Sequence, residues 1–128
     1  MATWAELLAF AKKNYEVVED EQESFALLLA GEGRRQKIVV RHSNLQGHEW
    51  INMLTGVCKE DELKHADALK LNGEFYAGAL ALMDGLYVLT YTLPLKTLEM
   101  DEFELPLNVL AVIADDLERT YAKGGDTF

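Results

Sequence analysis

The 128 residues of this chain are enough for one domain, because a chain of this size buries roughly two-thirds of the surface that it exposes when unfolded. Hydrophobic residues make up 49% and charged residues 27%, which excludes a disordered or fibrous protein. Against 12 Lys and Arg stand 22 Asp and Glu, and the net charge of -10 repels phosphate backbones and anionic lipid. We expect a single domain over residues 1–128 that binds neither nucleic acid nor membrane.

The cysteine content and the start of the chain predict a cytoplasmic protein. The single cysteine, Cys58, excludes a disulfide within the chain. The first ten residues lack the basic flank and long apolar run of a secretory signal, and no apolar stretch approaches the roughly 20 residues that cross a bilayer.

The first segment predicts a helix that begins at Thr3, because Thr3 and Glu6 have the spacing of a capping box. An apolar stripe follows at helical spacing, formed by Trp4, Leu7, Leu8, Ala11 and Tyr15. Residues 16–23 then carry five acids and no base. This segment is either an exposed connection or the start of a strand.

Three strands are expected next. Residues 25–30 and 34–42 have strand character and flank a turn at Gly31, Glu32 and Gly33, which predicts a hairpin. After a polar turn at residues 43–47, the aromatic and β-branched content of residues 48–57 predicts a third strand. Together these segments form an antiparallel meander.

A short helix and a second hairpin follow. Apolar residues near helical spacing predict a helix over residues 59–71, and Asn72-Gly73 supplies its stop. Residues 76–83 and 86–93 flank Asp84-Gly85, a strong signal for a tight two-residue turn.

The last segment predicts a long helix with a capping box at Asp101 and Glu104. Its inner face is expected to carry Phe103, Leu107, Leu110, Ala114, Leu117 and Tyr121. Pro106 is unfavourable inside a helix, so the helix either kinks there or has its main part begin at Pro106. Gly124-Gly125 is expected to end it.

This order of elements predicts an α+β fold: an antiparallel five-stranded sheet with N-terminal, short middle and C-terminal helices. The second hairpin is apolar on both faces, and the last helix is more apolar than one packing contact requires. A partner surface explains both features, and a homodimer is the simplest partner. The residues expected at the interface are Leu89, Tyr91, Val109, Val112 and Ile113.

The titratable residues do not form a recognisable catalytic or metal motif. His42, His48, Cys58 and His65 lack the short spacing of metal ligands or of a zinc ribbon. We expect no catalytic residue, no metal and no cofactor.

A basic stripe stands out on this acidic chain. Arg34, Arg35, Lys37 and Arg41 include no acid between them, and Arg35, Lys37 and Arg41 share one face of their strand. The stripe contacts an acidic partner segment or the chain's own acidic connection, or it is a solvated face that discourages edge-to-edge aggregation.

The C-terminal half resembles the YbjN family, which is grouped by fold with the type III secretion chaperones. The residues that carry the resemblance are Asn72, the strand at 77–82, Asp84-Gly85, Leu93-Pro94-Leu95, Asp101, Glu102 and the helix at 108–115. The resemblance implies a type III secretion chaperone-like fold, commonly a homodimer, that binds other polypeptides and has no catalytic residues. The N-terminal half departs more from the family.

We therefore expect a non-enzymatic, chaperone-like or regulatory homodimer that holds a client polypeptide by apolar contact, with strand addition as a further mode. The alternative is a small-molecule-binding or enzymatic domain, with a pocket between the sheet and the C-terminal helix that uses His42, His48 or Tyr91. A third possibility is an assembly subunit that only dimerises.

Overall fold

The computed structural model describes residues 2–30 and 35–123. Its helices are α1 (Trp4–Asn14), α2 (His65–Asn72) and α3 (Met100–Tyr121), with a short 3-10 helix η1 (Glu60–Glu62). Its strands are β1 (Glu16–Asp20), β2 (Ser24–Ala30), β3 (Arg35–Leu45), β4 (His48–Lys59), β5 (Ala79–Met83) and β6 (Leu86–Pro94). The predicted turn at Gly31–Gly33, the basic residue Arg34 and the helix stop at Gly124-Gly125 lie outside the described residues.

The strands form one antiparallel sheet in the order β1-β2-β3-β4-β6-β5. The α+β class and its three helices are confirmed, but the sheet has six strands where five were predicted. The additional strand is β1, which pairs with β2 from Glu16 opposite Leu28 to Asp20 opposite Phe25. The sequence left an exposed connection and the start of a strand as alternatives for this segment, and the structure shows the strand, whose Glu16 and Glu19 pair with Arg35 and Lys37 of β3.

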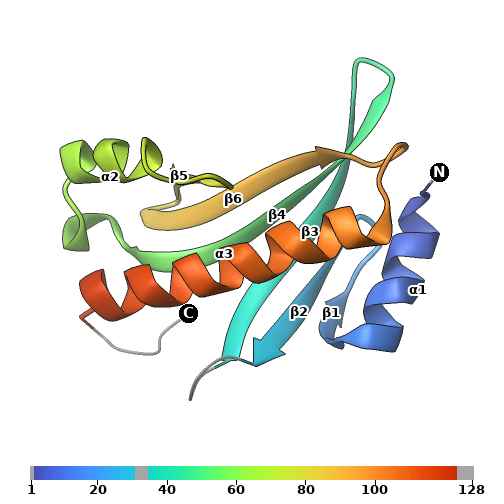
Figure 1. Ribbon diagram of the computed structural model, residues 1–128, viewed down its shortest axis with the longest axis horizontal. Coiled ribbons are helices and arrows are strands. Elements are labelled where there is room, and N and C mark those ends of the chain that lie inside the picture. Colours follow the sequence, from blue (N-terminus) through green and yellow to red (C-terminus); the bar gives the residue numbers. More distant parts are fainter. Residues whose placement is uncertain (1, 31–34, 124–128) are drawn as a thin grey trace.

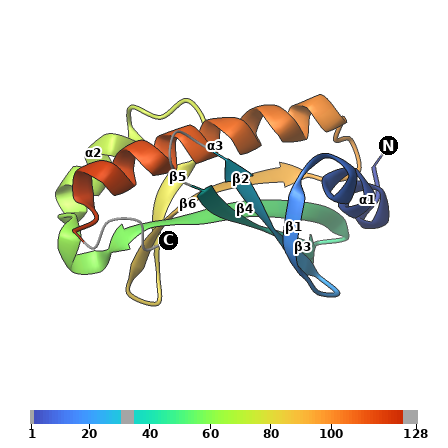
Figure 2. The same cartoon turned by 90° about the horizontal axis from the view of Figure 1, so that it is seen from below.

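The hydrophobic core lies between the sheet and the helices. α3 crosses the sheet diagonally, and α1 packs beside it at the β1 end (Figure 1). The fully buried side chains of α3, Phe103, Leu107, Leu110 and Ala114, join those of the covered sheet face, which include Phe25, Ile38, Val40 and Met53. Seen from below, the opposite face of the sheet carries no helix of the described residues (Figure 2).

The N-terminal helix begins where its capping residue predicted. Thr3 is the N-cap, and its hydroxyl oxygen accepts a hydrogen bond from the Glu6 backbone N–H at 3.1 Å. The Thr3 hydroxyl in turn donates a hydrogen bond to the Glu6 carboxylate at 3.0 Å, so the two side chains are also bonded to each other.

The predicted helix over residues 59–71 is divided. η1 ends at Glu62, buried Leu63 is extended, and α2 begins only at His65. The following strand begins at Ala79 rather than at residue 76, because Gly78 has a φ of +84° that breaks the extended backbone.

The predicted cap of the last helix is wrong by two residues. Glu99 is the N-cap, and its backbone N–H donates to the Glu102 carboxylate at 2.9 Å. Glu104 therefore takes no part in the cap, and its carboxylate instead contacts Tyr15, which follows the last residue of α1. α3 is one helix that contains Pro106 in its interior rather than a helix that begins there. Among the described residues, no helix has both the length and the apolar character that a membrane span needs.

Candidate functional site

The outer side of α3 carries large apolar residues that the fold does not cover. Leu105 is 69% exposed and Val112 is 63% exposed, whereas Leu107 and Leu110 on the inner side are fully buried. The helix therefore completes its contact with the sheet without Leu105 and Val112, and these two residues are available to a partner.

The two flanks of α3 differ in character. On one flank, the Tyr15 hydroxyl donates to the Glu104 carboxylate at 2.7 Å and ties α3 to the end of α1. Burial, then the hydrogen bond to Glu104 and its charge, raises the pKa of Tyr15. Ile113 lies nine residues, or about two and a half turns, after Glu104 and so points to the other flank.

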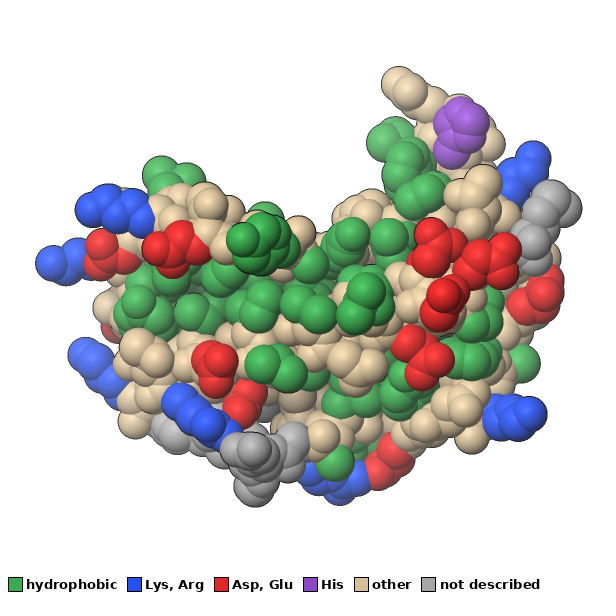
Figure 3. Space-filling view, in the orientation of Figure 1, with side chains coloured by type: hydrophobic (Ala, Val, Ile, Leu, Met, Phe, Trp, Pro, Cys, Tyr) green, Lys and Arg blue, Asp and Glu red, His purple; other side chains and the backbone are tan. Residues whose placement is uncertain are grey.

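We call this other side the apolar flank and define it by Leu105, Val109, Val112 and Ile113. Val109 and Ile113 are half-buried. Because Glu104 faces α1 at the β1 edge, the apolar flank faces the β5–β6 side of the sheet. A space-filling view shows hydrophobic side chains as a band over α3 and beside it in that direction (Figure 3).

Elements on the β5 side of the sheet also carry exposed hydrophobic residues. Of the seven large hydrophobic residues exposed in the described chain, three belong to α2, β5 or the connection between them: Leu69, Tyr76 and Leu82. The connection lies close to α3, since a Cβ added at Gly78 would stand only 2.7 Å from Leu110 Cδ2.

The structure places the five expected interface residues in three different surroundings. Val109, Val112 and Ile113 lie together on the apolar flank. Tyr91 is half-buried and packs against the core. Leu89 is fully buried, so its expected place at an interface is corrected: its side chain belongs to the core beneath α3.

The basic stripe lies on the sheet face that carries no helix. Arg35 forms an ion pair with Glu16, and Lys37 forms one with Glu19 at 2.5 Å. Arg41 donates instead to the Asn52 side-chain oxygen at 2.8 Å. For Arg35 and Lys37, the structure thus shows the contact with the chain's own acidic segment that was one of the alternatives.

The two edges of the sheet are closed in different ways. At the β5 edge, the Leu80 backbone N–H donates to Asn72 Oδ1 at 2.7 Å, and Asn72 Nδ2 donates to the Leu80 carbonyl at 3.3 Å. At the other edge, β1 carries three acids and an irregular register between Val17 and Glu19. Charge and irregularity of this kind discourage the addition of another strand.

The histidines of the alternative pocket do not converge on one cavity. His42 is held between Glu23 at 2.7 Å and Glu49 at 3.8 Å, and its ring stacks on Trp4. His48 lines a surface cleft of about 860 Å³ at the β3–β4 turn, with Trp50 and Lys96. The space between the sheet and α3 is filled by core side chains.

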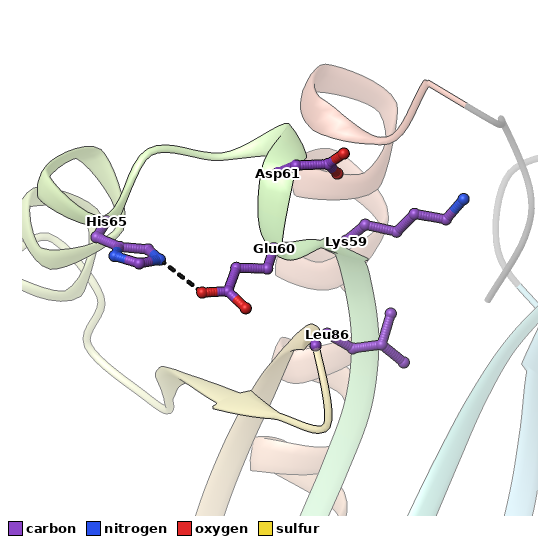
Figure 4. A pocket seen from close by; sticks show the side chains of 6 residues that line it. Lys59, Glu60, Asp61, His65 and Leu86 are labelled. Atoms are coloured by element: carbon purple, nitrogen blue, oxygen red, sulfur yellow. Dashed lines mark hydrogen bonds and ion pairs between the residues drawn. The ribbon is translucent and has the colours of Figure 1, made fainter.

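A second surface cleft, of about 690 Å³, lies at η1. Its lining includes Glu60, Asp61, His65 and Leu86, and Lys59 points away from the ion pair that His65 forms with Glu60 at 3.0 Å (Figure 4). Within residues 2–30 and 35–123, no group of three or more His, Cys, Asp or Glu could hold a metal ion.

Cys58 is fully buried at the end of β4. Burial, followed by the charges of Glu62 and Asp61, raises its pKa to about 11. These conditions keep the thiol protonated and oppose a role as nucleophile.

Comparison with known proteins supports the fold. No protein-family model matches the chain, and no curated protein matches it. A chain of the HopA1-SchA chaperone-effector complex has a TM-score of 0.61 at 11% identity, with 87% of each chain covered. A chain of the ExsC-ExsE complex has a TM-score of 0.67 at 14% identity, with 98% of this chain and 100% of that chain covered.

The protein therefore has the α+β fold of the type III secretion chaperones, as the resemblance implied. The YbjN family itself is not shown by these comparisons.

Proposed function

We propose that this protein is a non-enzymatic, chaperone-like binding protein of the cytoplasm that holds a partner polypeptide against the apolar flank. The observation that carries the proposal is the exposure of Leu105 and Val112 on a helix whose inner side is already fully packed. The similarity of the fold to a chain of a chaperone-effector complex supports it. A buried, unpaired cysteine agrees with a reducing compartment.

The proposed mode of binding is apolar contact between side chains. Strand addition at β5 is disfavoured, because the Asn72 amide occupies both backbone hydrogen-bonding groups of Leu80. Contacts made by leucine, valine and isoleucine side chains impose little sequence specificity, so partners of different sequence can share the surface.

We also propose that the protein is a homodimer. Tyr91, Val109, Val112 and Ile113 remain the candidate interface residues, and Leu89 is removed from the set because it is buried. An isologous interface requires the same surface on both copies. We place the two apolar flanks edge to edge, so that together they form one surface on which the partner polypeptide lies.

Native mass spectrometry of the tagged protein, isolated gently from its own cells, tests both proposals. We expect a mass near twice 14.4 kDa with an additional bound polypeptide. In Val112→Asp, the partner and the dimer should be lost while circular dichroism remains that of the folded protein. Val18→Asp is the matched control, since Val18 is also exposed but lies on β1.

The outcomes separate the two proposals. A dimer that loses only the partner in Val112→Asp removes the homodimer from the apolar flank. A dimer and partner that are both unchanged in Val112→Asp remove the flank from function. A monomer that carries a small molecule contradicts both proposals.

A further inference from the structure

Two acidic residues bracket the apolar flank along α3. Glu102 and Asp116 are 14 residues apart, or about four turns, so they lie on the same side of the helix and about 21 Å from each other along its axis. Val109 follows Glu102 by about two turns and Ile113 follows it by about three, so both lie between the acids on that side. Both acids are exposed.

The one cation of α3 is paired with a third acid. Arg119 follows Val112 by about two turns, and its guanidinium pairs with Asp115 at 2.8 Å. The Glu102 carboxylate accepts the Glu99 backbone N–H, and Asp116 contributes its backbone carbonyl to Thr120. In the part of the chain that the structure describes, neither acid forms an ion pair.

We propose that the apolar flank selects a polypeptide segment in which apolar residues are bracketed by Lys or Arg. This inference rests on the proposed function and specifies its partner. An extended segment advances about 3.3 Å per residue, so basic residues about six positions apart would reach both acids while the residues between them contact Val109, Val112 and Ile113. The protein's net charge of -10 attracts such a segment from a distance.

Two labelled synthetic peptides test the inference by fluorescence anisotropy. The first is Lys-Leu-Ala-Val-Ser-Leu-Lys with blocked ends, and the second has Glu in place of both Lys. We expect the first to bind about tenfold more tightly at low ionic strength, and the preference to fall to about threefold or less near 0.5 M salt, because exposed ion pairs are weak and screened.

Charge variants separate the local contact from the overall field. Glu102→Gln with Asp116→Asn should reduce the preference by at least about threefold, and Gln at position 102 still accepts the capping hydrogen bond. The matched control is Glu21→Gln with Asp84→Asn, which removes the same two charges from exposed positions outside α3. The control should keep most of the preference.

The failure of this inference differs from the failure of the proposed function. Equal binding of both peptides, abolished by Val112→Asp, overturns the charge selection and leaves the apolar docking intact. An equal loss of preference in the two charge variants overturns the inference in favour of a general field. If neither peptide binds, the inference is wrong, and partner capture from cells then decides the proposed function separately.

Discussion

Asn72 at the end of α2 pairs with the backbone of Leu80 in the way a neighbouring strand would. The Leu80 N–H donates to Asn72 Oδ1 at 2.7 Å, and Asn72 Nδ2 donates to the Leu80 carbonyl at 3.3 Å. One side chain thereby joins α2 to the outermost strand and closes part of its free edge.

Replacement of this side chain should destabilise the protein. Asn72→Ala leaves a buried strand residue with two unpaired backbone groups, so we expect the free energy of unfolding to fall by about 1–3 kcal/mol and the tendency to aggregate to rise. Asn108→Ala is the control, because Asn108 bonds only the Glu104 carbonyl one turn earlier on an exposed helix face. Urea unfolding and light scattering would measure both effects, and equal stability of the two variants would remove the proposed role of Asn72.

Gly78 and Gly85 both have positive φ, at +84° and +81°, but their surroundings differ. A Cβ at Gly78 would stand 2.7 Å from Leu110 Cδ2 and 3.2 Å from the Thr90 carbonyl, whereas a Cβ at Gly85 would meet nothing within 4 Å. We expect Gly85→Ala to cost about 1–2 kcal/mol through backbone strain alone. Gly78→Ala should cost about 1–3 kcal/mol more through overpacking, measured by urea unfolding. Equal costs would show that α3 shifts freely above the connection.

Truncation of Leu89 and truncation of Val112 should differ greatly in their effect on stability. Leu89→Ala leaves a cavity in the core and should lower the free energy of unfolding by about 2–5 kcal/mol. Val112→Ala should change it by less than about 0.5 kcal/mol, because the side chain is exposed. Thermal unfolding of each variant at a concentration where the protein is monomeric checks this, and a small effect at Leu89 would return that residue to the candidate interface.

The pair also shows what the sequence can and cannot predict. Periodicity correctly placed Leu107 and Leu110 on the inner side of α3 and left Val112 outside, because one helix face meets one sheet. Alternation likewise separated exposed Lys37 from buried Ile38. Alternation in β6 groups Leu89 with Tyr91 but does not say which face α3 covers, since that depends on packing between distant segments.

The sequence did not decide whether β1 is a strand, for a related reason. Its local residues, five acids in residues 16–23 with only two large apolar side chains, fit either an exposed connection or the start of a strand. In the structure, Glu16 and Glu19 reach Arg35 and Lys37 across β2, a contact between segments almost 20 residues apart. Local composition carries no information on such a pairing.

The contact between Lys37 and Glu19 should be weak and sensitive to salt. Their side chains are 44% and 54% exposed, so a double-mutant cycle with Lys37→Gln and Glu19→Gln should give a coupling free energy of about 0.2–1 kcal/mol that declines as salt is added. A coupling free energy of zero would mean that Glu19 of β1 does not form the ion pair with Lys37 in solution. The basic stripe would then be available to an acidic partner segment.

Cys58 should make the stability of the protein depend on alkaline pH. Burial first, then Glu62 and Asp61, raises its pKa to about 11, so the folded state holds the thiol proton more strongly than the unfolded state does. The resulting stabilisation is fully present below the pKa of the unfolded thiol, about 8.5, and is lost as pH rises towards 11, at up to about 1.4 kcal/mol per pH unit.

Urea unfolding between pH 8 and pH 11 should therefore show a steeper loss for the natural protein than for Cys58→Ala. Burial also raises the pKa of Tyr15, which contributes equally in both proteins. The pKa of Tyr87 is raised by burial, then by the charges of Glu60 and Cys58, so part of its contribution is lost together with Cys58. At pH 8, a thiol reagent should label native Cys58 only as fast as the structure opens, and label the unfolded chain at once. Rapid labelling of the native protein, or identical pH profiles for the two proteins, would show that the thiol is accessible at the end of β4.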